Sequence, residues 1–234
     1  MVFFAKNRRI TIVVILMFLF INGNVKGQER DFGAWFSFDV SKDLTSRFSM
    51  ELEQEARIFK NFGEWDRHST SLSGDFAITG WLKGGAGYML IFNHKVNSDT
   101  WDTRHRYLLY LQGRQKAGRF TFFLRERFQS TFVKEETADD LGFEFVNRDY
   151  LRSRLKVDYD IKNNKLEPYA SAEVYYSLHK SGDNEINDIR YTLGAEFPVG
   201  GKFDLDTYLR LDQELNVKNP VNLFVVGVAL QLGL

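Results

Sequence analysis

The sequence predicts an all-β fold, namely an antiparallel up-and-down transmembrane β-barrel of about 10–12 strands. Segments of about ten to fourteen residues alternate apolar and polar side chains along nearly the whole chain. Successive side chains of a strand point to opposite sides, so each segment has an apolar face and a polar face. Such strands are longer than soluble sheets usually need and match the roughly 9–11 residues with which a tilted strand crosses a bilayer.

The first 27 residues are interpreted as a cleaved signal peptide that precedes a single barrel domain over 28–234. Lys6, Arg8 and Arg9 give a positive start, and residues 10–21 form an apolar run that is short for a membrane helix. The segment ends on Gly27, a small residue suited to cleavage. An uncleaved anchor is the alternative. Nothing after residue 28 is apolar for long enough to be a membrane helix, so a membrane position requires a closed sheet.

Composition excludes several classes of function. Without residues 1–27 the chain has 27 basic and 31 acidic residues, which gives no reason to expect a nucleic-acid partner. There is no cysteine, so an exported protein of this size must be held by packing and hydrogen-bond closure. No cluster of His or Cys has metal-ligand spacing, and we expect neither a metal nor a cofactor.

The first hairpin shows the alternation best. Residues 32–40 place aromatic side chains on every second position, and a short polar turn leads to 46–58. There Phe48, Leu52 and Ile58 share one face with a single polar residue, Gln54, while the other face is almost entirely charged. The second pair covers about 67–79 and 82–93 and turns near Gly80, and the third covers 103–116 and 119–131 and turns at Ala117-Gly118.

The remaining strands follow the same rule. Pairs are predicted at about 148–160 with 167–178 and at 189–197 with 203–215, the latter turning at Gly200-Gly201. Pro220 then breaks the chain before a last strand, 222–234, whose apolar face suits the barrel-assembly machinery as a partner. This makes eleven strands, whereas bacterial single-chain barrels have even numbers. Either 32–40 is therefore not a full wall strand or a short strand is hidden near the amino terminus.

Short turns alternate with longer connections, which is typical of bacterial outer-membrane barrels with periplasmic turns and extracellular loops. The predicted loops are 59–66, 93–102, 131–147 and 179–188. Aromatic residues near strand ends are expected to form belts at the two lipid interfaces. These interface aromatics are Trp35, Trp65, Trp81, Tyr88, Tyr107, Tyr159, Tyr176 and Tyr191.

The polar faces predict a lumen crowded with charge. An acidic strand and several basic strands supply the expected network: Glu51, Glu53, Glu55, Arg57, Arg104, Arg106, Arg125, Arg127, Arg152, Arg154, Glu173, Arg190 and Glu196. Buried charges are tolerable only when they pair, so we expect carboxylates and guanidiniums to meet across a narrow, filled lumen. The alternative is a selective channel or an anionic-ligand site built on the arginines. Glu126 shares the lipid-facing side of its strand and has no explanation here beyond a rim position or a bulge.

Catalysis has weak support. Some small barrels carry a Ser/His pair on the wall, and His68 lies beside Ser69 and Ser71, but neighbouring strand residues point apart. His105 sits between two arginines. No nucleophile elbow or phosphate loop is present, so no catalytic residue is predicted and the protein is expected not to be an enzyme.

Several short motifs, taken in order, carry a family resemblance. They are Asp31-Phe32-Gly33-Ala34-Trp35, the segment 50–57, Gly84-Gly85-Ala86-Gly87-Tyr88, Arg104-His105-Arg106-Tyr107 and Arg125-Glu126-Arg127-Phe128-Gln129. From residue 31 to its end the chain resembles the DUF2490 family, secreted bacterial proteins common in Bacteroidetes-type organisms. The resemblance implies an outer-membrane barrel but no activity, so no site residue can be transferred.

Together these observations predict a small barrel in a Gram-negative outer membrane, in contact with its lipid, non-enzymatic, with a charge-filled lumen and surface loops. A narrow channel for small solutes or ions, a lipid-modifying enzyme and a soluble periplasmic carrier remain the alternatives.

Overall fold

A computed structural model describes residues 29–96, 98–136, 142–178, 184–217 and 219–234. The predicted signal peptide lies outside these residues, as do parts of the predicted loops 93–102, 131–147 and 179–188. The described chain forms eleven strands. They are β1 (Glu29–Asp43), β2 (Phe48–Phe59), β3 (Glu64–Ala77), β4 (Leu82–Lys95), β5 (Thr100–Ala117), β6 (Phe120–Glu136), β7 (Phe143–Tyr159), β8 (Glu167–Leu178), β9 (Glu185–Gly200), β10 (Phe203–Glu214) and β11 (Val221–Gly233). None of the described residues forms a helix long and apolar enough to cross a membrane.

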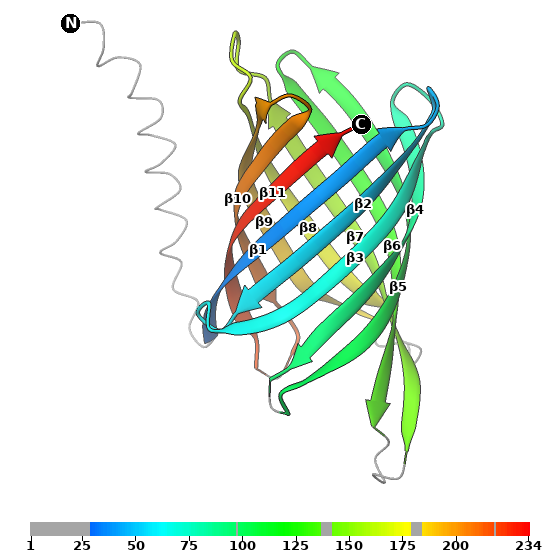
Figure 1. Ribbon diagram of the computed structural model, residues 1–234, viewed down its shortest axis with the longest axis vertical. Helices are drawn as coiled ribbons and strands as arrows, with labels where there is room; N and C mark the ends of the chain where they lie inside the picture. Colours follow the sequence, from blue (N-terminus) through cyan, green and yellow to red (C-terminus); the bar gives the residue numbers. More distant parts are fainter. Residues whose placement is uncertain (1–28, 97, 137–141, 179–183, 218) are drawn as a thin grey trace, which may run out of the picture.

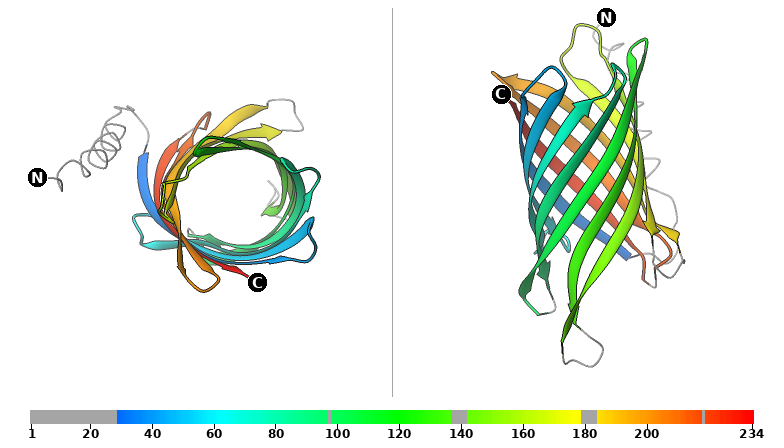
Figure 2. Two further views of the ribbon diagram at one scale, coloured as in Figure 1. Left: turned by 90° about the horizontal axis from the view of Figure 1, so that it is seen from above. Right: turned by 90° about the vertical axis from the view of Figure 1, so that its right-hand side faces the viewer.

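The strands close into one barrel, as Figures 1 and 2 show. Each strand pairs antiparallel with its neighbours in sequence, and β1 closes the ring by pairing parallel with β11, from Glu29 opposite Val221 to Ser41 opposite Gly233. The predicted all-β up-and-down barrel and its count of eleven strands are confirmed.

The expectation of an even strand number is wrong. The segment 32–40 lies inside β1, a full wall strand of 15 residues that pairs along both edges. In a meander every strand reverses direction, so the first and last of eleven run the same way. A parallel ladder satisfies their backbone groups without a twelfth strand.

The two ends of the barrel differ. At one end, which we call the turn end, lie the short connections such as 44–47 and 118–119, and there Leu234 N donates to Ser41 O. At the other, the loop end, Glu29 N donates to Pro220 O. Figure 1 shows the β6–β7 hairpin reaching furthest at the loop end.

Strands extend into all four predicted loops. Most of the predicted loop 131–147 belongs to β6 and β7, and β5 begins at Thr100 inside the predicted loop 93–102. The β6–β7 ladder continues without a break through this extension, from Thr131 opposite Arg148 to Glu136 opposite Phe143. In this extension the Lys134 ammonium lies 3.7 Å from the centre of the Phe143 ring.

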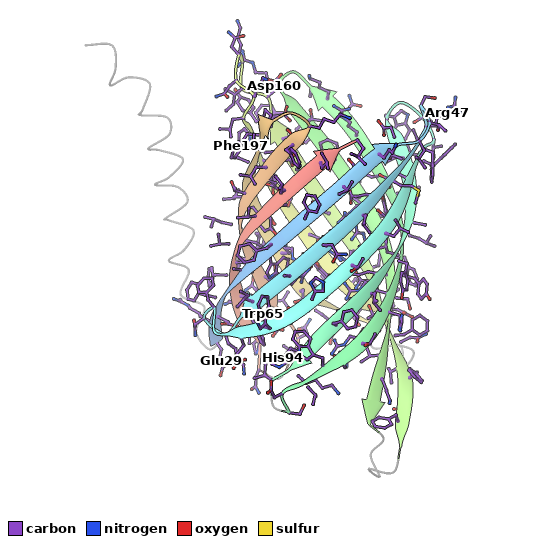
Figure 3. The ribbon with its side chains drawn as sticks, in the orientation of Figure 1. Glu29, Arg47, Trp65, His94, Asp160 and Phe197 are labelled. Atoms are coloured by element: carbon purple, nitrogen blue, oxygen red, sulfur yellow. The ribbon has the colours of Figure 1, made fainter. Side chains whose placement is uncertain are left out.

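Side chains at odd and even positions of each strand lie on opposite faces of the barrel wall. Large apolar side chains are exposed on the outer surface of every part of the barrel, among them Phe36, Leu72, Leu109, Leu124 and Val226. The alternate positions point into the lumen and are mostly polar or charged. Figure 3 shows side chains along the whole wall, with Trp65 and His94 near the loop end and Arg47 and Asp160 near the turn end.

Candidate functional site

Glu173 on β8 lies at the centre of the lumen charges. Its side chain is buried, and its two carboxylate oxygens accept hydrogen bonds from Arg125 Nη2 at 2.9 Å and Arg152 Nη2 at 2.8 Å. Arg190 Nη1 lies 3.9 Å from the same carboxylate. Arg152 also donates through Nη1 to Gln129 Oε1 at 2.9 Å. Charge-assisted bonds of this kind are about twice as strong as neutral ones, and they compensate the desolvation of the group.

Trp35 forms a second centre. Only 3% of the residue is exposed, and three guanidiniums lie against its indole. The Arg57, Arg210 and Arg190 Cζ atoms are 3.5, 4.5 and 5.0 Å from the ring centroid. Arg57 Nε donates to Glu55 Oε1 at 2.7 Å. The aromatic face attracts all three guanidiniums and so offsets part of their mutual repulsion.

The expected interface position of Trp35 is wrong. Odd-numbered positions of β1 point into the lumen, so the strand alternation that puts Phe36 outside puts Trp35 inside.

Arg190 joins the two centres. It donates through Nε and Nη2 to the Asp212 carboxylate at 2.8 and 2.6 Å, while it also contacts Trp35 and approaches Glu173. The resulting network runs along the lumen from β6 through β7, β8, β9, β10 and β1 to β2. We call it the Trp35–Glu173 layer. Its members are Trp35, Glu55, Arg57, Arg125, Arg152, Glu173, Arg190, Arg210 and Asp212.

A cavity of about 470 Å³ adjoins this layer on the side of the turn end. A second hollow at the mouth of the turn end, lined by the β1–β2 turn, shares Ser49, Asp75 and Lys83 with it. We call the 470 Å³ cavity the vestibule. The vestibule places an acidic and a basic wall around one space, since Glu51 and Glu53 line it from β2 while Arg127 and Arg154 line it from β6 and β7.

Some charges of the vestibule are already paired. Asp75 forms an ion pair with Lys83 and accepts a hydrogen bond from the Tyr110 hydroxyl. Lys156 Nζ lies 2.7 Å from Glu196 Oε1. In contrast, Glu51, Glu53, Arg127 and Arg154 form no ion pair with another described residue. Arg127 Nε is buried without a hydrogen-bond partner.

The register places like charges directly opposite each other on both walls. Asp39 faces Glu53 across the β1–β2 ladder. Across the β6–β7 ladder, Arg125 faces Arg154 and Arg127 faces Arg152. Like charges directly opposite each other destabilise a sheet, so this arrangement works against the barrel's own stability.

The remaining residues of the predicted network stay near the wall. Arg104 Nε donates to Asp102 at 3.0 Å, and Arg106 donates to Thr131 Oγ1 at 2.9 Å. The described ion pairs join residues at most two strands apart, such as Arg125 on β6 with Glu173 on β8. The expectation that ion pairs span the lumen from one side to the other is therefore wrong for the described residues. Sequence reasoning placed Asp212 on the charged face but missed Arg210, although its alternation with Leu209 and Leu211 marks it as lumen-facing.

Most of the other predicted interface aromatics lie on the outer surface. Five of them are exposed: Trp65, Trp81, Tyr107, Tyr176 and Tyr191. The Tyr88 ring packs against the Tyr107 ring in a tilted arrangement with centroids 5.3 Å apart, and Tyr159 packs against Phe120 at 5.0 Å. Their role at a lipid interface stays a prediction.

The outer surface also carries a few polar pairs. Glu126 lies on a regular stretch of the β6–β7 ladder without a bulge, and it accepts a hydrogen bond from Ser153 Oγ at 2.6 Å. His105 Nδ1 lies 2.7 Å from the Tyr88 hydroxyl on the same surface. His68 is exposed on the outside, whereas Ser69 is buried on the lumen side. In the described part of the chain, no group of three or more His, Cys, Asp or Glu is placed to hold a metal ion.

The comparisons with known proteins agree with this architecture. Residues 32–221 match the model of the family described as "Protein of unknown function (DUF2490)", and the chain belongs to this family. The NanC porin structure is similar, with a TM-score of 0.51 and 10% identity over 82% of this chain and 93% of that chain. At this identity the likeness shows the barrel fold alone. Two further structures match with lower scores, a refined porin (TM-score 0.37, 14% identity, 76% of this chain and 56% of that chain) and the β-domain of the Bordetella autotransporter BrkA (0.41, 10%, 72% and 78%). No curated protein matches the sequence.

Proposed function

We propose that this DUF2490 protein is a small, non-enzymatic outer-membrane β-barrel whose lumen is closed across its middle by the Trp35–Glu173 layer. The turn end would face the periplasm and the loop end the outside of the cell, as in other bacterial barrels. The layer leaves the vestibule open toward the periplasmic side. We expect the protein to bind small solutes in that vestibule rather than to conduct freely.

The outer surface supports the membrane position. Leu72, Leu109, Leu124 and Val226 are each close to half exposed, and comparable side chains cover the other strands. A soluble protein rarely exposes an apolar surface of this extent, whereas a barrel in lipid gains from it. The last strand adds the outward row Phe224, Val226, Val228, Leu230 and Leu232, which we propose as the contact for barrel-assembly machinery.

Burial of the layer is the observation that carries the closed lumen. Trp35 and Glu173 are each 3% exposed, and Arg125 and Arg152 are 8% and 7% exposed, although all four point into the lumen. Water in an open pore would solvate these side chains. Their burial together with their pairing supports a packed barrier.

Planar-bilayer recording of the refolded mature chain tests the barrier. We expect no discrete current steps from the wild type, and steps from the Trp35→Ala/Arg57→Ala double variant, which removes the closest stacked pair of the layer. Trp65→Ala, a change on the outer surface, serves as the matched control and should stay silent. Steps from the wild type, or a double variant that is as silent as the wild type, would contradict the proposal.

Membrane fractionation with a heat-modifiable gel shift tests the location. The mature chain should need detergent for extraction and should migrate faster when it is not boiled. Recovery from soluble periplasm would instead support a carrier.

A narrow channel is the second candidate. The segregated charges of the vestibule favour it, and the similar NanC structure is named a porin. Small discrete steps from the wild type would establish this function in place of the closed barrel.

A further inference from the structure

We infer that the vestibule binds a small zwitterionic solute, with an ammonium group against Glu51 and Glu53 and a carboxylate against Arg127 and Arg154. This inference rests on the proposed closed lumen only in that the layer forms the floor of the vestibule. It names a class of ligand that neither the family nor the similar structures provide.

The basic wall contains guanidiniums that form no ion pair. Glu173, the acid of the Trp35–Glu173 layer on β8, is already bonded to Arg125 and Arg152. Arg127 and Arg154 form no ion pair with a described carboxylate, although Arg154 lies opposite Glu173 in the β7–β8 ladder, and the unpartnered Nε of Arg127 is buried. The guanidinium carries a planar fork of donors that matches a carboxylate, so a ligand carboxylate would supply the partner the protein lacks here.

The acidic wall is complementary. Glu51 and Glu53 line the vestibule without a basic partner, and Asp39 lies directly opposite Glu53 with a buried Oδ1 that makes no hydrogen bond. A compact ammonium group brings three donors and one positive charge, which would neutralise part of this cluster.

The two walls lie on opposite sides of one small space. In the ring of eleven strands, β2 is separated from β6 and β7 by three and four intervening strands, which is close to a half-turn of the barrel. The cavity of about 470 Å³ has the size of a small-molecule site. Clefts with charged, low-dielectric walls focus the electrostatic field. A simple anion would meet the repulsion of Glu51 and Glu53, and a simple cation that of the arginines, whereas a zwitterion gains at both ends.

Equilibrium binding to the refolded barrel in a non-ionic detergent at pH 7 tests the inference. The probes are glycine, 4-aminobutyrate and 6-aminohexanoate, which carry both charges at increasing separation. Acetate and ethylamine, butyrate and butylamine, and hexanoate and hexylamine are the singly charged controls. We expect at least one zwitterion to bind about tenfold more tightly than both of its matched controls, which corresponds to about 1.4 kcal/mol.

Variants then assign the two ends. Glu53→Gln and Arg127→Gln should each weaken binding of the preferred zwitterion about tenfold. Glu126→Gln, the same chemical change on the outer surface, should leave its affinity unchanged. If Arg127→Gln does not refold, which the gel shift reports, Arg154→Gln and the wild-type comparison of probes still decide the question.

Three results would overturn the inference. They are equal affinity for a zwitterion and its carboxylate control, equal affinity for a zwitterion and its amine control, and no binding of any zwitterion. The bilayer recording is independent of this test: current steps would remove the closed lumen while the detergent-based affinities stand, and a silent bilayer without zwitterion binding would remove this inference alone.

Discussion

The Trp35–Glu173 layer and the vestibule use the same residue types with opposite results. In the layer, Glu173 faces Arg154 on one neighbouring strand and Arg190 on the other, so basic groups surround it along the wall. In the vestibule, Glu53 faces Asp39 on one side and Ser71 on the other, so neither of its ladder partners can neutralise it. From β7 to β10 the signs alternate on adjacent strands, and these charges pair in a packed barrier. Signs segregated to opposite sides of the barrel leave a cavity with a field across it.

Removal of the central acid should produce the largest effect on stability. Glu173→Gln keeps the shape of the side chain but leaves Arg125 and Arg152 without their shared carboxylate. Loss of one partner of a buried ion pair costs about 3–5 kcal/mol, and we expect a decrease of this size in the free energy of unfolding. Denaturant unfolding of the refolded barrel in detergent measures it.

The matched control changes a partly exposed acid of the same lumen. Glu196 is paired with Lys156 at 2.7 Å, but about a third of its side chain is exposed. Glu196→Gln should cost less than about 1 kcal/mol, because solvent screens such a pair. If both variants unfold alike, the layer does not differ from the vestibule in the way its burial indicates.

Truncation of the aromatic centre should come second. Trp35→Ala removes a buried ring and the surface on which Arg57, Arg190 and Arg210 rest, and we expect a loss of about 3 kcal/mol. Trp35→Phe keeps an aromatic face and should lose about 1 kcal/mol. Equal losses in the two variants would mean that the stacked guanidiniums contribute nothing. The same unfolding assay applies.

The smallest effect should have the opposite sign. Glu53→Gln removes one of two carboxylates that face each other in register, so repulsion with Asp39 falls. We expect the variant to be more stable than the wild type by roughly 0.5 kcal/mol, within the range of cross-strand pairs. A clear loss of stability would show that Glu53 is paired after all. The same Glu→Gln change is therefore expected to lower the stability of the barrel at Glu173 in the layer and to raise it at Glu53 in the vestibule.

Much of the fold was predictable from the alternation of side chains. The alternation in 46–58 and 222–234 locates β2 and β11 to within about two residues, because a wall between an apolar and a polar medium must alternate. Whether the number of strands is odd or even was not predictable, because nothing in the sequence of β1 indicates whether its second edge pairs with β11 or with a further strand. The extension of β6 and β7 into the predicted loop was also missed, because its outward positions mix Phe143 and Phe145 with Lys134 and Asn147 and form no continuous apolar face.

The candidate site divides in the same way. Parity along each strand assigned Glu173, Arg152 and Arg127 to the lumen, and the same rule applied to Trp35 contradicts its expected place at an interface. Which charge meets which is a different question, because it depends on register and on the order of strands around the ring. Glu173 and Arg125 are 48 residues apart in sequence and meet only when β6, β7 and β8 are aligned.

The sequence by itself therefore determined which side chains lie on each face of the wall, because side chains alternate along a strand whichever strands lie beside it. Only the tertiary structure decided which charges cancel and which stay unpaired around a cavity, because that depends on the closure of the barrel and on the level at which each strand presents its side chains.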